Sequence, residues 1–159
     1  AGMNIIGKTT INPFFFYTGK IAGYATWILL VLSLLNVINI SMYSCPFPRY
    51  GAYAAFVAGI AFVVLSSINL GKSTRLGLPG EDTVLKTGGI YKFSRNPMYV
   101  GFNCFTLSSM LYTSNPFVDI AGIYSIVIYH FIIRGEEKFL LERFGAAYIE
   151  YKSRVRRYL

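Results

Sequence analysis

The feature that most limits the possible folds of this chain is a pair of long apolar runs without a charged side chain. One run covers residues 21–42 and the other covers residues 52–70, and each is long enough to cross a bilayer as a helix. Only 14% of the 159 residues are charged, against about 25% in an ordinary soluble domain. Within the second run, Ala54, Ala58 and Ala61 predict a face for close helix packing, and alanines that face lipid stay open as the alternative. The sequence therefore predicts an all-α, polytopic integral membrane helical bundle.

A second pair of apolar segments follows a long polar stretch. Asn96 and Pro97 predict the start of a third helix, because an Asn side chain can accept from a free N–H group and proline has no N–H to lose. We expect this helix over residues 97–113 and a fourth helix that ends near residue 133, with Ser114-Asn115-Pro116 as the turn between them. The bundle would then have about four transmembrane helices, of which the last two form a tight antiparallel hairpin.

The C-terminal segment has the pattern of an amphipathic helix that lies on the membrane surface or packs over the polar stretch before the third helix. We expect it over residues 138–159, after Glu136 and Glu137, which if taken alone would be solvated charges favoured by the helix dipole. Its apolar face would consist of Leu140, Phe144, Ala147, Tyr148 and Tyr151. The basic residues expected near anionic headgroups are Arg154, Arg156 and Arg157.

Lysine and arginine are distributed very unevenly over the two ends of such a bundle. The chain has 15 of them, and 14 fall in the segments expected at one end, whereas Arg49 alone falls at the other. Loops rich in these residues remain in the cytoplasm, so we expect both termini and the polar stretch of residues 71–95 on the cytoplasmic side. The net charge of +8 therefore indicates membrane orientation and not nucleic-acid binding.

Two polar stripes predict a site at the cytoplasmic edge of the hairpin. Polar residues inside membrane helices are costly and usually face a cavity or a partner. In an antiparallel hairpin the start of one helix lies beside the end of the next, so an anion-binding helix start with Arg95 would face the acidic pair Glu136 and Glu137. The stripes are Asn96, Tyr99 and Asn103 on the third helix and His130, Arg134 and Glu137 on the fourth.

Each of these residues also has a simpler interpretation that the sequence leaves open. Arg95 and Asn96 would then be a helix cap at the membrane surface, with the arginine facing lipid phosphates. Arg134 would be an interfacial arginine whose stem lies in lipid, and His130 a hydrogen-bonded residue of the bundle interior.

The residues around this edge resemble a known family. The pattern Gly89-x-Tyr91-x-x-x-Arg95-Asn96-Pro97-x-Tyr99-x-Gly101 is followed by a hydrophobic hairpin and then by Glu136-Glu137-x-x-Leu140-x-x-x-Phe144-Gly145-x-x-Tyr148-x-x-Tyr151-x-x-x-Val155-x-Arg157. Together they resemble the isoprenylcysteine carboxyl methyltransferase and phospholipid methyltransferase superfamily. The resemblance spans residues 71–157. It implies a single integral membrane methyltransferase domain over residues 1–159, with its catalytic core in residues 71–157.

The resemblance implies S-adenosyl-L-methionine as the methyl donor, S-adenosyl-L-homocysteine as the product and no metal. Arg95, Asn96 and Tyr99 would hold the methionine part, and Glu136 and Glu137 its amine or the ribose hydroxyls. The other motif residues assigned to the cofactor pocket are Tyr91, Pro97 and Gly101. The family usually has histidine at the position of Asn96, and because asparagine cannot carry a charge, no proton transfer is expected there.

The resemblance also implies a lipophilic acceptor that enters from the bilayer. A prenylcysteine-like carboxylate is favoured, because it is already anionic and needs no general base. Arg134 would pair with this carboxylate, His130 would orient Arg134 or Glu137, and the Tyr99 ring would face the sulfonium. N-methylation of phosphatidylethanolamine, an NADPH-dependent membrane reductase related to sterol reductases, and a non-enzymatic lipid-binding protein stay open as alternatives.

Overall fold

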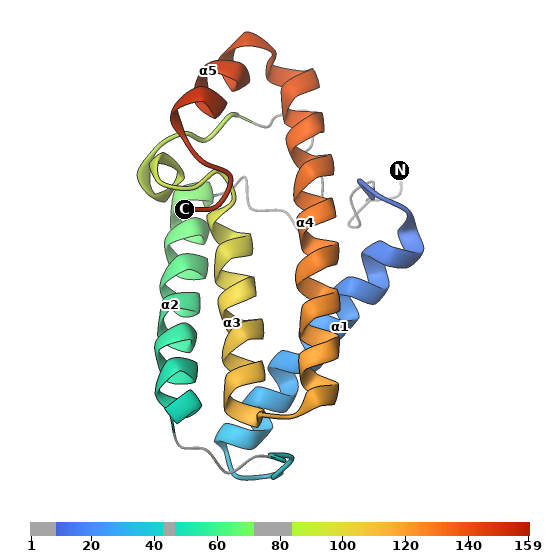
Figure 1. Ribbon diagram of the computed structural model, residues 1–159. Helices are drawn as coiled ribbons and strands as arrows, with labels where there is room; N and C mark the ends of the chain where they lie inside the picture. Colours follow the sequence, from blue (N-terminus) through green and yellow to red (C-terminus); the bar gives the residue numbers. More distant parts are fainter. Residues whose placement is uncertain (1–8, 43–46, 72–83) are drawn as a thin grey trace.

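The computed structural model describes residues 9–42, 47–71 and 84–159, and every regular element in these ranges is a helix. Four long helices form the bundle: α1 (Pro13–Leu34), α2 (Phe47–Leu70), α3 (Pro97–Thr113) and α4 (Pro116–Phe144). A short 3-10 helix, η2 (Gly89–Lys92), precedes α3, and α5 (Ala146–Arg154) follows α4. Figure 1 shows α2, α3 and α4 side by side, with α1 crossing them at an angle.

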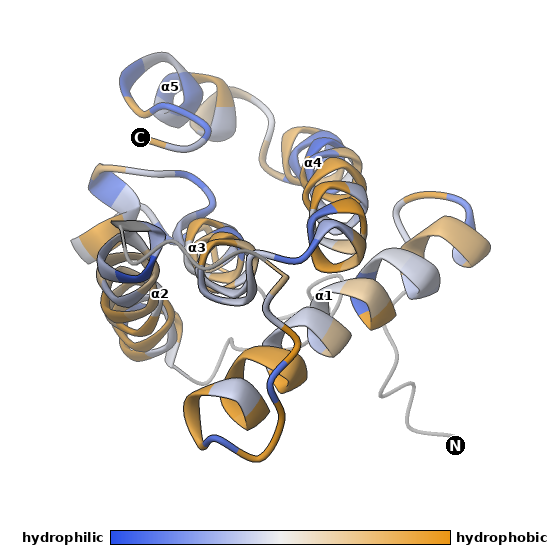
Figure 2. Ribbon diagram, turned by 60° about the horizontal axis from the view of Figure 1, so that its bottom comes forward, coloured by the Kyte–Doolittle hydropathy of each residue, from blue (hydrophilic) through white to orange (hydrophobic). Residues whose placement is uncertain are grey.

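Three of these helices are long and apolar enough to cross a membrane, namely α1, α2 from Pro48 onward, and α4. The helix α3 has 17 residues and packs against the other three. Figure 2 shows apolar residues along the long helices and hydrophilic residues gathered in α5 and the connecting segments. The predicted helical membrane bundle is therefore confirmed, and the third of the four predicted helices, α3, is the shorter one.

The prediction for the first span was shifted by eight residues. The helix α1 begins at Pro13 and not at residue 21, because the Asn12 side chain accepts a hydrogen bond from the Phe14 N–H at 2.9 Å and caps the helix. It ends at Leu34, and Asn36 turns the chain with a φ of +56°. Residues 37–42 are consequently not helical, although four of the six are apolar.

The second span was predicted with the correct end and the wrong packing face. Its helix starts at Phe47, five residues before the predicted start, whereas residues 43–46 lie outside the described ranges. Ala54 and Ala61 are exposed, and the buried small residues are Ala52, Gly59 and Ser66, seven positions apart. A Cβ on Gly59 would lie 3.1 Å from the Gly101 carbonyl oxygen, so α2 and α3 meet at these two glycines.

The predicted third helix and hairpin turn are confirmed. The helix α3 spans Pro97–Thr113, and the Asn115 side chain accepts from the Phe117 N–H at 3.0 Å at the start of α4. The prediction that the fourth helix ends near residue 133 was wrong, because α4 continues for 29 residues until Gly145 adopts a φ of +50°. This single long helix carries Glu136 and Glu137 beside the start of α3.

Several polar side chains inside the bundle form hydrogen bonds to a neighbouring helix. The indole N–H of Trp27 donates to Thr106 Oγ1 at 3.0 Å, Ser109 Oγ donates to the Thr26 carbonyl at 2.7 Å, and Ser108 Oγ donates to the Ala52 carbonyl at 2.7 Å. In lipid, apolar burial contributes little to helix association, so such hydrogen bonds and close contacts determine the packing. They hold α3 in place between α1, α2 and α4.

Candidate functional site

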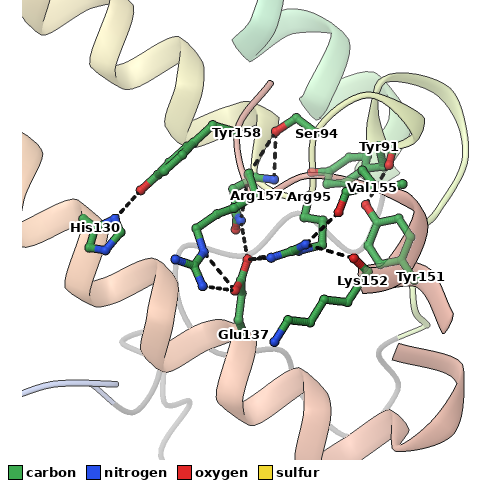
Figure 3. Close-up of polar contacts among 11 residues, drawn as sticks. Tyr91, Ser94, Arg95, His130, Glu137, Tyr151, Lys152, Val155, Arg157 and Tyr158 are labelled. Carbon is green, nitrogen blue, oxygen red and sulfur yellow. Dashed lines mark hydrogen bonds and ion pairs between the residues drawn. The ribbon is translucent and has the colours of Figure 1, made fainter. Parts of the chain in front are cut away.

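The centre of the site is the Glu137 carboxylate, which lies between two arginines (Figure 3). Its Oε1 accepts from Arg95 Nε at 3.1 Å and from Arg95 Nη2 at 3.0 Å. Its Oε2 accepts from Arg157 Nε at 3.0 Å and from Arg157 Nη2 at 2.9 Å. The Arg95 and Glu137 side chains are each 7% exposed. Both arginines present two donors to one oxygen, so the carboxylate is firmly held.

Asn96 supplies a further donor to the same carboxylate. Its Nδ2 donates to Glu137 Oε1 at 3.0 Å and to the Arg157 carbonyl at 3.2 Å. The prediction that Asn96 precedes the first residue of α3 is confirmed, but its side chain makes no capping hydrogen bond. That part of the prediction was wrong, because the amide turns toward the carboxylate of α4.

A C-terminal strap, residues 155–158, returns from α5 and crosses the start of α3. The Arg95 N–H donates to the Arg156 carbonyl at 2.9 Å, and Arg95 Nη1 donates to the Val155 carbonyl at 2.6 Å. Ser94 Oγ donates to the Arg157 carbonyl at 3.3 Å. Arg95 is thus bonded to both α4 and the strap, and the strap cannot leave without exposing Glu137.

Glu136 lies on the other side of α4, toward α1. Tyr99 Oη donates to its Oε1 at 2.8 Å, and Glu136 has no ion pair shorter than 4 Å with any described residue. Its charge acts on Tyr91, whose pKa is raised to about 12 by burial first and by Glu136 second. Glu136 is therefore a half-buried carboxylate with capacity for another donor.

His130 faces a mostly apolar groove on the strap side of the hairpin. Its Nδ1 and Tyr158 Oη are 2.7 Å apart, so the histidine of α4 and the strap share a hydrogen bond. The groove has a volume of about 430 Å³. Asn103 Oδ1 is buried there without a hydrogen-bond partner in the described part of the chain. The lining residues are Asn103, Ile126, Val127, His130, Phe131 and Tyr158.

The two predicted polar stripes do meet, but their residues contact one another in different places and do not form a single pocket. Asn96 lies opposite Glu137 and Asn103 shares the groove with His130, whereas Tyr99 points to Glu136. Arg134 is exposed and has no hydrogen bond or ion pair with the described residues, so the structure does not bring it into this network.

The remaining predicted residues have packing roles in the structure. Pro97 is fully buried in the first turn of α3, and a Cβ on Gly101 would lie 3.0 Å from the Gly59 carbonyl oxygen of α2. The Tyr91 side chain is buried, and its carbonyl accepts from Tyr151 Oη at 2.7 Å. Glu136 and Glu137, each taken alone, had the simpler interpretation of solvated charges at a helix start, and this interpretation was wrong because they lie inside α4.

Sequence reasoning missed the roles of Arg157 and Tyr158. Arg157 was expected near lipid headgroups, but its hydrogen bonds to Glu137 raise the pKa of its guanidinium and fix it in the network. The position of Arg157 in the family pattern could have indicated this role. Nothing in the spacing indicated that a turn at Gly145 would bring the last residues back over α3.

The comparisons with known proteins identify the family. A family model described as "Phospholipid methyltransferase" matches residues 48–147, more than half of the chain. The chain belongs to the phospholipid methyltransferase family. The matched residues of this family member include α2, α3 and α4, so both polar stripes lie within the match, and the strap lies beyond it.

Curated relatives carry a more specific name. "Protein-S-isoprenylcysteine O-methyltransferase" of Saccharomyces cerevisiae is 42% identical over 78 residues, which cover 47% of this chain and 32% of that protein. "Protein-S-isoprenylcysteine O-methyltransferase A" of Arabidopsis thaliana is 31% identical over 105 residues, which cover 64% of this chain and 48% of that protein. This family member therefore spans less than half of the length of the relatives it matches.

Replacing Glu137 by glutamine tests the network. The Glu137→Gln variant leaves two guanidinium groups near each other without their counter-charge. Breaking a buried ion pair typically costs 3–5 kcal/mol, and because Arg157 is about a third exposed we expect about 2 to 4 kcal/mol of lost unfolding free energy. Reversible unfolding of the two proteins in mixed micelles measures this difference in unfolding free energy.

The control is Glu150→Gln, which breaks the exposed pair with Arg154 on α5. We expect this change to cost about 0.5 kcal/mol or less. Equal effects of the two substitutions would contradict a central role for Glu137.

Proposed function

We propose that this family member transfers a methyl group from S-adenosyl-L-methionine to the carboxylate of a lipophilic, prenylcysteine-like acceptor. Family membership and the names of the curated relatives support methyl transfer. The observation that carries the proposal is an apolar groove lined by Tyr158, whose neighbour in the sequence, Arg157, is bound to Glu137. An acceptor with an apolar tail and a carboxylate head matches this arrangement.

The residues around Glu136 fit the cofactor by their chemistry. A half-buried carboxylate with spare acceptor capacity suits an ammonium group or ribose hydroxyls, and the buried Tyr91 and half-buried Tyr99 rings suit a sulfonium. When bound, S-adenosyl-L-methionine supplies an electrophilic methyl group. We assign Tyr91, Tyr99 and Glu136 to contacts with it.

Arg95, Asn96 and Glu137 have a different role in this proposal. Their polar atoms are bonded to one another and to the strap, so they act as positioning residues that fix the start of α3 against α4. Alignment of the two reactants contributes roughly 7 to 11 kcal/mol in favourable cases, so a rigid junction at this point matters for rate. Pro97 and Gly101 support the same junction through packing.

Arg157 is the better-placed arginine for the acceptor carboxylate. Its Nη1 makes no hydrogen bond to the described residues, while Nε and Nη2 hold Glu137. Arg134, the arginine suggested by the sequence pattern, is exposed on α4. The carboxylate needs no deprotonation, so His130 is assigned to holding Tyr158 at the head of the groove.

Methylation of a phospholipid amine is the second candidate, and the description of the matching family model favours it. An amine acceptor must first lose a proton to a base within hydrogen-bond reach. His130 is the candidate base, and one of its two ring nitrogens is engaged with Tyr158.

We also propose that the site and both termini face the cytoplasm, and that membrane lipids surround the bundle. The support is the uneven distribution of basic residues, with Arg49 alone at the far end. Cys45, which lies outside the described residues, is predicted at that far end.

Titration with S-adenosyl-L-homocysteine tests the cofactor assignment. We expect Glu136→Gln to weaken binding by about 1 to 3 kcal/mol, because the glutamine keeps the acceptor for Tyr99 and loses the charge. Calorimetry on the purified protein measures the change. The control is Glu142→Gln, an exposed glutamate of the same helix, and NADPH serves as a ligand that should not bind. Unchanged affinity in Glu136→Gln would remove Glu136 from the site.

Assays with two acceptor types test the acceptor class. We expect turnover of an S-prenylated cysteine with a free carboxylate and none of phosphatidylethanolamine. His130→Ala should retain part of the activity, because it removes a positioning contact and not a base. Turnover of phosphatidylethanolamine by the parent that is lost in His130→Ala would reverse the assignment.

Thiol labelling tests the orientation. In a Cys104→Ser background, we expect an impermeant reagent to label Cys45 from the outside of intact cells, since the basic residues hold the opposite end in the cytoplasm. Labelling that occurs only after the membrane is opened would invert the proposed topology.

A further inference from the structure

The end of the bundle opposite the strap contains a polar hollow that the proposed methyl transfer does not use. Its volume is about 350 Å³, and its walls come from the segment after α1, the start of α2 and the end of α3. In Figure 1 these three segments lie together at the bottom of the molecule. The polar or aromatic residues that matter here are Ser33, Asn36, Asn39, Arg49, Tyr112 and Thr113.

The hollow is built into the fold by hydrogen bonds of its walls. After α1, the Val37 N–H donates to the Leu32 carbonyl at 2.9 Å, which closes the turn at Asn36. Asn115 Nδ2 donates to the Ile40 carbonyl at 2.7 Å and ties this segment to the hairpin turn between α3 and α4. The walls are therefore fixed relative to three helices.

Two groups in the hollow have no hydrogen bond or ion pair with the described residues. Ser33 is 7% exposed, and its Oγ is buried without a hydrogen-bond partner. Arg49 makes no ion pair with them, and its guanidinium lies over the Tyr112 ring, 5.7 Å from the centroid. A buried hydroxyl without a partner costs free energy, so Ser33 indicates a ligand with hydrogen-bonding oxygens. Arg49 is exposed and can reach such a ligand.

The charge of this end identifies the class of ligand. Arg49 is the only lysine or arginine in residues 21–71. In the described part of this end the acidic residue is Asp119, in the first turn of α4, and it does not line the hollow. A guanidinium can bind a phosphate through two parallel hydrogen bonds, and amide and hydroxyl side chains can add further donors. A phosphate group matches these donors in charge and in geometry.

We propose that this hollow binds the headgroup phosphate of an anionic phospholipid from the leaflet at that end. The lipid is favoured over free phosphate because the hollow lies at the ends of helices that cross the membrane. From Arg49 onward, α2 presents the exposed apolar residues Val57, Ile60 and Val64, along which acyl chains can lie. The inference does not depend on the proposed methyl transfer.

Native mass spectrometry of the full chain, purified from a mixture of phosphatidylglycerol and phosphatidylcholine with the same acyl chains, tests the inference. We expect phosphatidylglycerol to be retained preferentially. Arg49→Gln should lower its retention about tenfold, the scale of one lost charge-assisted hydrogen bond. Ser33→Ala should lower it about threefold without loss of stability, because the Ser33 hydroxyl has no partner within the described chain.

The matched control is Arg156→Gln, which removes the same charge from an exposed side chain at the other end of the bundle. It should retain phosphatidylglycerol like the parent. Equal retention of both lipids with no effect of Arg49→Gln would show that the hollow holds only water. Complete displacement of the lipid by excess inorganic phosphate would show a site for free phosphate and would overturn the lipid assignment.

Discussion

The arrangement of this protein depends on one carboxylate held by two guanidinium groups. Glu137 accepts from Arg95, which begins the junction to α3, and from Arg157, which belongs to the last residues of the chain. Burying a carboxylate beside a membrane costs free energy unless its charge is balanced and its oxygens accept hydrogen bonds. The charge of Glu137 is balanced only when α3, α4 and the strap are in place together. This carboxylate therefore holds three segments that are distant in sequence against one another.

Much of the fold could be predicted because the membrane restricts the choices. Long uncharged runs can only be helices, and the Asn-Pro pairs at residues 96–97 and 115–116 gave correct helix starts. The same signal at Asn12-Pro13 was overlooked in favour of the apolar run itself, which is why α1 was shifted. Apolar composition indicates that a helix exists, whereas caps indicate where it begins.

The site was predicted in part, for a physical reason. The antiparallel geometry of the hairpin predicted that Asn96 and Glu137 would meet. Asn96 Nδ2 lies 3.0 Å from Glu137 Oε1. The partner of Arg95 was expected to be a ligand anion, and it is the chain's own glutamate. Spacing along a helix gives the face of a residue, but it does not show that a later turn at Gly145 supplies Arg157 as a second cation.

The length of α4 determines the depth at which the proposed chemistry takes place. A helix of 29 residues extends about 43 Å, roughly 13 Å more than the hydrocarbon thickness of a bilayer. Glu136 follows Pro116 by twenty positions, or about 30 Å along the axis. A helix that enters the hydrocarbon at Pro116 therefore delivers Glu136 to the opposite boundary with water. At that boundary a water-soluble donor can bind without entering the hydrocarbon, and a membrane-dissolved acceptor can bind without leaving it.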